Sequence, residues 1–218
     1  MKSYGNPDAK EKARKLSDAE KRRLAAFNEL SDRMEQEGYR KTELTISIVK
    51  ANVFAIVLLI PVMVIGFGLF FLLNREFRMA RSVSDMLLLA GGVLILTVAH
   101  ELVHGLSWAL FTGQHMKDIE FGFMKEYLTP YCACKVPLKK GQYIFGALMP
   151  LVLVGLVPLA AGILTGYFPL LLIGIVMTVS AAGDIMIVWN ILRYRSAAAE
   201  VLYVDHPTQG GGIIFEKQ

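Results

Sequence analysis

Hydrophobic positions along this chain gather into four long runs, separated by shorter polar segments. The runs cover residues 51–73, 86–111, 143–165 and 168–192. Each is longer than the roughly 20 residues that an α-helix needs to cross about 30 Å of hydrocarbon. A mean hydropathy of +0.46 is also high for a soluble domain of this length. The pattern predicts an all-α polytopic membrane protein with about four transmembrane helices.

The polar N-terminal segment contains one amphipathic pattern. Ser17 and Glu20 have the spacing of a capping box. Hydrophobic residues then recur at helical spacing as far as Met34, and Gly38 is a natural helix stop. We therefore expect a helix over residues 18–37. It could lie on the membrane or dock a partner, but its narrow apolar stripe favours packing against the protein's own cytosolic face.

The loop between the second and third runs, residues 112–142, has the pattern of strands. Hydrophobic side chains alternate over residues 119–123, and residues 131–136 form a second candidate strand. This predicts a small β-hairpin, whose edge could pair with an extended substrate. Cys132 and Cys134 are too close for an unstrained disulfide. A Cys-x-Cys pair can help to bind a metal, but two small strand residues on one face is the favoured interpretation.

The second apolar run carries an HExxH motif at His100, Glu101 and His104. On a helix, two histidines four residues apart lie on one face, where they can hold one Zn²⁺. Glu101 is then placed to take a proton from a water and not to bind the metal. The alternative is three unrelated polar residues on a buried helix. Ionisable groups at membrane depth cost about 2.5–3.5 kcal/mol each, which favours a bound cation.

A catalytic zinc needs a third protein ligand, and Asp184 in the fourth run is our choice. The second and fourth runs cross the membrane in the same direction, and the positions of His100 and Asp184 along them differ by only about 3 Å in depth. Glu120 and Glu126 in the loop are competing ligands. His206 in the C-terminal tail is a weaker candidate, because a lone tail histidine is usually solvated.

The charge distribution limits the partners and suggests an orientation. The net charge of +4 is small, and no basic stripe with interleaved aromatic residues is present, so a nucleic-acid partner is not expected. The N-terminal segment, the long loop and the C-terminal tail hold 19 Lys and Arg, against three in the short link after the first run. The positive-inside rule then places both termini in the cytoplasm.

Several motifs together resemble a known family. They are the Ala-His-Glu-Leu-Val-His-Gly sequence, the loop running into Lys139-Lys140-Gly141-Gln142-Tyr143, the Ala-Gly-Asp of the fourth run and the Asp-His-Pro of the tail. This combination resembles a bacterial family of putative zincin peptidases and, more distantly, the site-2 proteases, which are membrane-embedded zinc endopeptidases. The resemblance implies His100, His104 and Asp184 as zinc ligands and Glu101 as the base. The Asn-Pro and Leu-Asp-Gly residues usual around the aspartate of site-2 proteases are absent here.

These observations predict a zinc metallopeptidase in the bacterial inner (plasma) membrane that hydrolyses peptide bonds of membrane or membrane-proximal proteins. We expect residues 1–45 to form a charged cytoplasmic tail, residues 46–195 the four-helix zinc peptidase domain and residues 196–218 a C-terminal tail. The alternative is a non-enzymatic metal-binding scaffold or ion carrier. Glu101 favours the enzyme, because a simple binding site does not need a carboxylate that is not a ligand.

Overall fold

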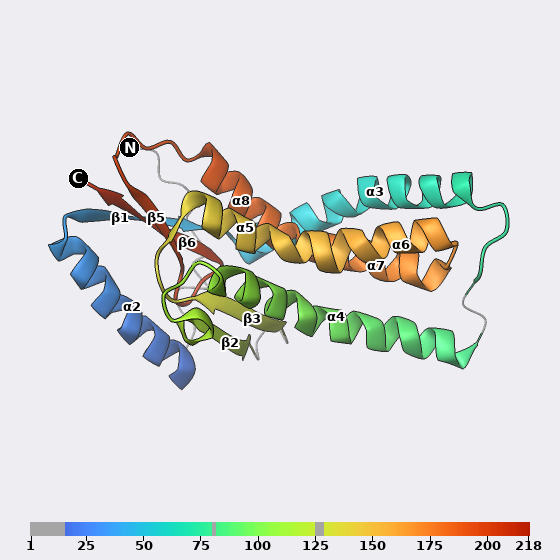
Figure 1. The fold of residues 1–218 in the computed structure, drawn as a ribbon, viewed down its shortest axis with the longest axis horizontal. Helices are drawn as coiled ribbons and strands as arrows, with labels where there is room; N and C mark the ends of the chain where they lie inside the picture. Colours follow the sequence, from blue (N-terminus) through green and yellow to red (C-terminus); the bar gives the residue numbers. More distant parts are fainter. Residues whose placement is uncertain (1–15, 80–81, 125–128) are drawn as a thin grey trace.

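The computed structural model of the protein describes residues 16–79, 82–124 and 129–218, which form an apolar helical bundle joined to an end that contains two sheets (Figure 1). The helices are α2 (Asp18–Gln36), α3 (Ile48–Leu73), α4 (Val83–Ala109), α5 (Lys140–Pro150), α6 (Val157–Thr165), α7 (Phe168–Ser180) and α8 (Ala182–Arg193). A π-helical segment at Leu151–Leu156 joins α5 to α6, and a short 3₁₀ turn covers His115–Asp118.

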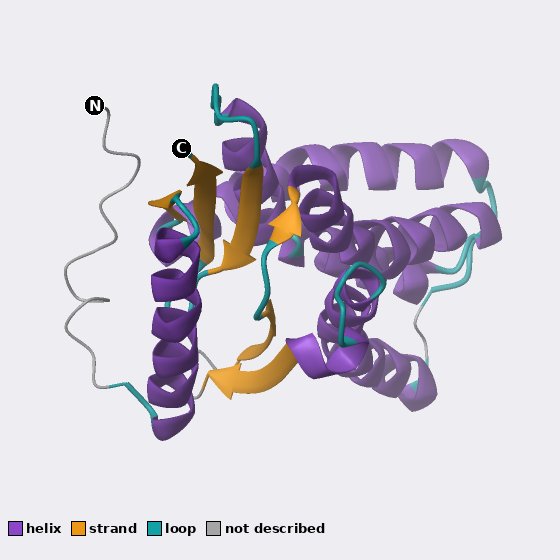
Figure 2. Ribbon diagram, turned by 60° about the vertical axis from the view of Figure 1, so that its left-hand side comes forward, coloured by secondary structure: helices purple, strands orange, loops and turns teal. Residues whose placement is uncertain are grey.

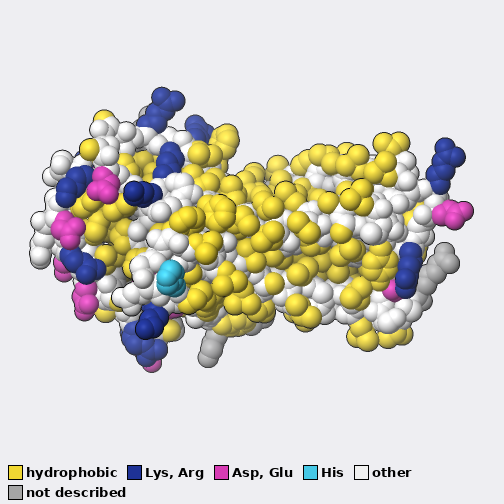
Figure 3. Space-filling view, viewed as in Figure 1, with side chains coloured by type: hydrophobic (Ala, Val, Ile, Leu, Met, Phe, Trp, Pro, Cys, Tyr) yellow, Lys and Arg dark blue, Asp and Glu magenta, His cyan; other side chains and the backbone are white. Residues whose placement is uncertain are grey.

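Three apolar helices in the described residues are long enough to cross a membrane: α3, α4 and the continuous α5–α6 helix, Lys140–Thr165. A fourth span is possible if α7 and α8, which are bent by 40° at a short break, are counted as one. Hydrophobic side chains cover the surface of this bundle, and charged side chains gather at its two ends (Figure 3). The mostly helical architecture is therefore confirmed, and its long apolar helices fit a membrane protein.

The break between α7 and α8 was not predicted, because the fourth run reads as continuously apolar. Ser180 donates its hydroxyl to the carbonyl of Met177 at 2.8 Å. This carbonyl is the acceptor that the backbone N–H of Ala181 would use in a regular helix, and such side-chain competition bends helices. As a result Asp184 lies in the first turn of α8. The partial positive charge of a helix N-terminus favours a carboxylate there.

A four-stranded antiparallel sheet corrects the all-α expectation. Its strands are β1 (Tyr39–Thr45), β6 (Gly211–Lys217), β5 (Val201–Asp205) and β4 (Leu138–Lys139), in that spatial order. In the register of the sheet, Ile214 of β6 is opposite Thr42 of β1 and Tyr203 of β5. The two segments expected to be tails thus pair with each other. Sequence patterns did not indicate this sheet, because its pairing joins residues that are far apart along the chain.

Helix α2 packs on this sheet and does not stand apart from it (Figure 2). The predicted helix is confirmed, and the capping box is formed by Ser17 and Glu20. Leu30 and Met34 of α2 are buried against side chains of the sheet that include Phe215. The favoured interpretation, a helix packed on the protein itself, agrees with these contacts.

The predicted hairpin is also present, formed by β2 (Ile119–Met124) and β3 (Thr129–Cys134). It lies against the C-terminal half of α4, and Gly105 permits the close approach. A Cβ atom at Gly105 would lie 2.3 Å from the ring of Phe121. The hairpin therefore covers the helix at the position directly after His104.

Candidate metal centre

Three side chains from two helices meet at the end of the bundle nearest the sheets. His100 and His104 are buried on one face of α4, and Asp184 reaches them from the first turn of α8. Nε2 of His100 lies 3.2 Å from Oδ2 of Asp184, and Nε2 of His104 lies 3.4 Å from Oδ1. One ligand atom from each residue lies within 4.8 Å of the others. The matched depth expected for the histidines and Asp184 therefore corresponds to proximity in space.

The orientation of His104 is fixed by helix α5. Its Nδ1 lies 2.9 Å from the carbonyl oxygen of Gly146, which can only accept, so Nδ1 carries a proton and Nε2, which faces Asp184, is the nitrogen left to bind an ion. The indole of Trp108 stacks on His104 and donates to the carbonyl of Tyr143 at 3.0 Å. A Cβ atom at Gly146 would lie 2.1 Å from this indole. Glycine is thus required where α5 approaches the metal-facing histidine.

The imidazole of His100 has fewer supporting contacts than that of His104. Its Nε2 faces Asp184, while its Nδ1 is buried without a hydrogen-bond partner in the described part of the chain. The hydroxyl of Thr97, one turn earlier, donates to the carbonyl of Val93 at 2.8 Å and so does not support the imidazole. The set of two imidazole nitrogens and one carboxylate oxygen is that of a catalytic zinc with three protein ligands. These residues therefore fit a zinc ion.

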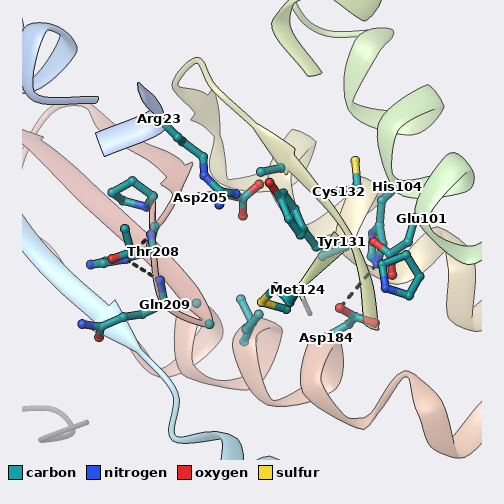
Figure 4. Close-up of a pocket in the computed structure, with 18 of the residues that line it drawn as sticks. Arg23, Glu101, His104, Met124, Tyr131, Cys132, Asp184, Asp205, Thr208 and Gln209 are labelled. Atoms are coloured by element: carbon teal, nitrogen blue, oxygen red, sulfur yellow. Dashed lines mark hydrogen bonds and ion pairs between the residues drawn. The ribbon is translucent and has the colours of Figure 1, made fainter. Parts of the chain in front are cut away.

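Glu101 lies beside this group without being part of it. The backbone N–H of Cys132 in strand β3 lies near its carboxylate. Glu101, His104 and Asp184 line one cavity of about 250 Å³, which continues between the hairpin and the sheet (Figure 4). A carboxylate held next to a metal site in a cavity can accept a proton from a water bound there.

The competing acidic ligands do not join this group among the described residues. Glu120 of β2 accepts a hydrogen bond from the hydroxyl of Tyr131 at 3.3 Å and lies 3.9 Å from Nε of Arg23. It is not among the side chains that cluster with His100. Glu126 lies outside the described residues.

The cysteines and the tail histidine have other surroundings. Cys132 and Cys134 are free thiols on β3, and burial raises the pKa of both, that of Cys134 to about 12. Neither cysteine is among the side chains that cluster with His100, which agrees with the favoured interpretation of small strand residues. Nδ1 of His206 accepts hydrogen bonds from the backbone N–H groups of Thr208 and Gln209, and burial lowers its pKa to about 4. His206 is therefore a neutral cap of its loop and not the solvated side chain that we expected.

Asp205 is a cavity residue that the sequence did not single out, apart from its place in the Asp-His-Pro run. It accepts hydrogen bonds from the hydroxyl of Tyr143 in α5 and from the backbone N–H of Cys134 at 2.7 Å. Burial raises the pKa of Asp205 to about 6, and these two hydrogen bonds limit the rise. Asp205 thereby ties the sheet, the hairpin and α5 together beside the candidate metal centre.

Comparison with known proteins supports the chemistry of this site. Residues 93–199, just under half of the chain, match a protein family described as putative zincin peptidase. The match confirms the resemblance drawn from the motifs, and it includes the three residues of the candidate centre as well as Glu101. It indicates a metallopeptidase that uses zinc. No curated protein and no solved structure matches the chain.

Proposed function

We propose that this chain is a membrane-embedded zinc metallopeptidase that hydrolyses peptide bonds of membrane or membrane-proximal proteins. The observation that carries the proposal is the position of Glu101. It shares a cavity with His104 and Asp184, yet it is not one of the clustered ligand atoms. A scaffold or carrier site would need the three ligands alone.

Each residue then has a separate role. His100, His104 and Asp184 would hold the ion, and the Gly146 carbonyl would keep a proton of His104 on the nitrogen that faces away from it. When bound, zinc polarises the scissile carbonyl and lowers the pKa of a water toward 7. Glu101 accepts the proton of the attacking water and returns it to the leaving amine.

The position of the site along α4 supports a substrate that is cut near a membrane surface. His104 is five residues from the end of the helix at Ala109, about 8 Å along its axis. The cavity is bounded by the loop at residues 206–211 and by the hairpin, both at the polar end of the molecule. A peptide can therefore reach the ligands from the aqueous side without crossing the bundle.

The charge bias leads us to propose that this polar end faces the cytoplasm, with both termini there. A reporter enzyme that is active only outside the cytoplasm, fused after Gln218, is expected to be inactive, and a reporter that needs the cytoplasm is expected to work. Fusion of the same pair in the link after α3, at Glu76, should give the opposite result. A periplasmic signal at Gln218 would contradict the proposed orientation.

Removal of the metal tests the proposed function itself. We expect the detergent-purified protein to cleave pooled peptides in a mass-spectrometric assay, to lose this activity after treatment with a zinc chelator, and to recover it with one equivalent of Zn²⁺ but not with Mg²⁺. The reason is that two imidazoles and one carboxylate suit zinc better than magnesium. Cleavage at an unchanged rate by metal-free protein would refute the proposal, whereas stoichiometric zinc without cleavage would favour the scaffold or carrier.

A further inference from the structure

Arg23 of α2 is a mostly buried cation without a hydrogen-bonded partner in the described residues. Its side chain is 11% exposed, and its Nε is fully buried and makes no hydrogen bond. The closest carboxylate oxygen, on Glu120, is 3.9 Å away, beyond hydrogen-bonding distance. The guanidinium lies 4.4 Å above the ring of Tyr131. Arg carries five N–H donors, and leaving such donors unpaired away from water is costly.

This side chain extends into the space that leads to the candidate metal centre. Arg23 lines the same cavity as Glu101 and Asp184, and Figure 4 shows it reaching from α2 toward Asp205. It also lines a second cavity, of about 400 Å³, between α2 and the strands. The two cavities share five lining residues: Arg23, Ala133, Asp205, His206 and Pro207. Arg23 thus lies where a path from the surface joins the metal-binding cavity.

The neighbouring acidic groups already have hydrogen-bond donors. Asp205 accepts from Tyr143 and from the backbone of Cys134, and Glu120 accepts from Tyr131. The second cavity is also lined by Arg22 and Lys135, so its basic side chains outnumber its acidic ones. The Arg23 guanidinium has a distant ion pair with Glu120 but makes no hydrogen bond to the described residues, so it is the group best suited to receive an additional anion.

We propose that Arg23 binds a carboxylate of the peptide substrate and so determines which substrates are held across the metal centre, an inference that rests on the proposed peptidase function. The contact with the Tyr131 ring restricts the motion of the guanidinium, which can pair with a carboxylate through two parallel hydrogen bonds. The carboxylate could belong to an acidic side chain or to a free C-terminus. In either case Arg23 acts on binding and not on the bond that is broken.

Peptide binding to the zinc-loaded Glu101→Gln protein tests this without requiring turnover. Pooled randomised peptides are prepared in matched forms, with Glu or Gln at internal positions and with a free or amidated C-terminus. Adding Arg23→Gln should weaken binding of carboxylate-bearing peptides about 10- to 100-fold, the effect of losing a charge-assisted hydrogen-bond pair. Peptides without carboxylates should bind as before. The form that loses affinity identifies the side chain or the C-terminus as the source.

Two further variants keep the result interpretable. Arg33→Gln, at an exposed position in the last turn of the same helix, removes an equal charge and should not change binding. Arg23→Lys retains the charge but not the paired donors, so it should show a smaller loss with the same selectivity, and it replaces Arg23→Gln if that variant does not fold. Equal losses for all peptides, or no loss, would make Arg23 a structural anchor of α2 and overturn the inference. Since binding is measured, failure here is distinct from failure of the peptidase assay.

Discussion

Replacing Glu101 with glutamine should abolish peptidase activity while the protein keeps its fold and its zinc. Glutamine has nearly the same shape as glutamate, but its amide group cannot act as a base. General acid–base catalysis by one side chain typically contributes about 10²- to 10⁴-fold in rate, so kcat should fall by that amount or more. The measurement is kcat on a cleaved peptide, together with zinc content from elemental analysis.

The control is Glu29→Gln, which removes the same charge from an exposed position on α2. It should cleave at the wild-type rate and bind the same amount of zinc. If Glu101→Gln retained full activity, Glu101 would not be the proton carrier, and the assignment of a zincin mechanism to this site would fail. If zinc were lost together with activity, Glu101 would be a ligand and not a base.

Replacing Asp184 with asparagine should weaken zinc binding and activity together. Zinc held by two neutral imidazoles keeps its full double charge in a low-dielectric environment, where charge is costly, and the carboxylate of Asp184 halves it. Removing a residue that only hydrogen-bonds to a metal ligand typically lowers metal affinity about 10–100-fold, and removing a ligand itself should cost more. We therefore expect Asp184→Asn to reduce zinc affinity by more than about 100-fold, as measured by competition with a chelator of known affinity. His100→Ala should also lose zinc.

The competing carboxylates supply the controls. Glu120→Gln and Glu126→Gln should leave the zinc stoichiometry unchanged, as should Asp32→Asn at an exposed position on α2. Glu120 in particular is engaged with Tyr131 and does not join the histidine cluster. Full zinc occupancy in Asp184→Asn, combined with loss in either loop variant, would move the third ligand into the hairpin. If Asp184→Asn loses zinc while Glu101→Gln retains it, Asp184 is a zinc ligand and Glu101 is a base.

Features set by short-range interactions were predictable from the sequence. The apolar runs, the capped helix α2 and the shared face of His100 and His104 follow from helix geometry over a few residues. The hairpin at β2 and β3 could be predicted for the same reason, since its partners are close along the chain. The proximity of Asp184 to the histidines could also be predicted, because the position of a residue along a membrane-spanning run determines its depth in the membrane.

Contacts between segments that are far apart in the sequence were visible only in the tertiary structure. The sheet joins β1 to β6 from opposite ends of the chain, and no local pattern indicates which distant strand will be the partner. The break before α8 was not visible in the continuous apolar pattern of the fourth run. Arg23 reaches the cavity only because α2 packs on that sheet. Periodicity reports which face of an element is buried, whereas the identity of its neighbours depends on contacts that form only when the whole chain has folded.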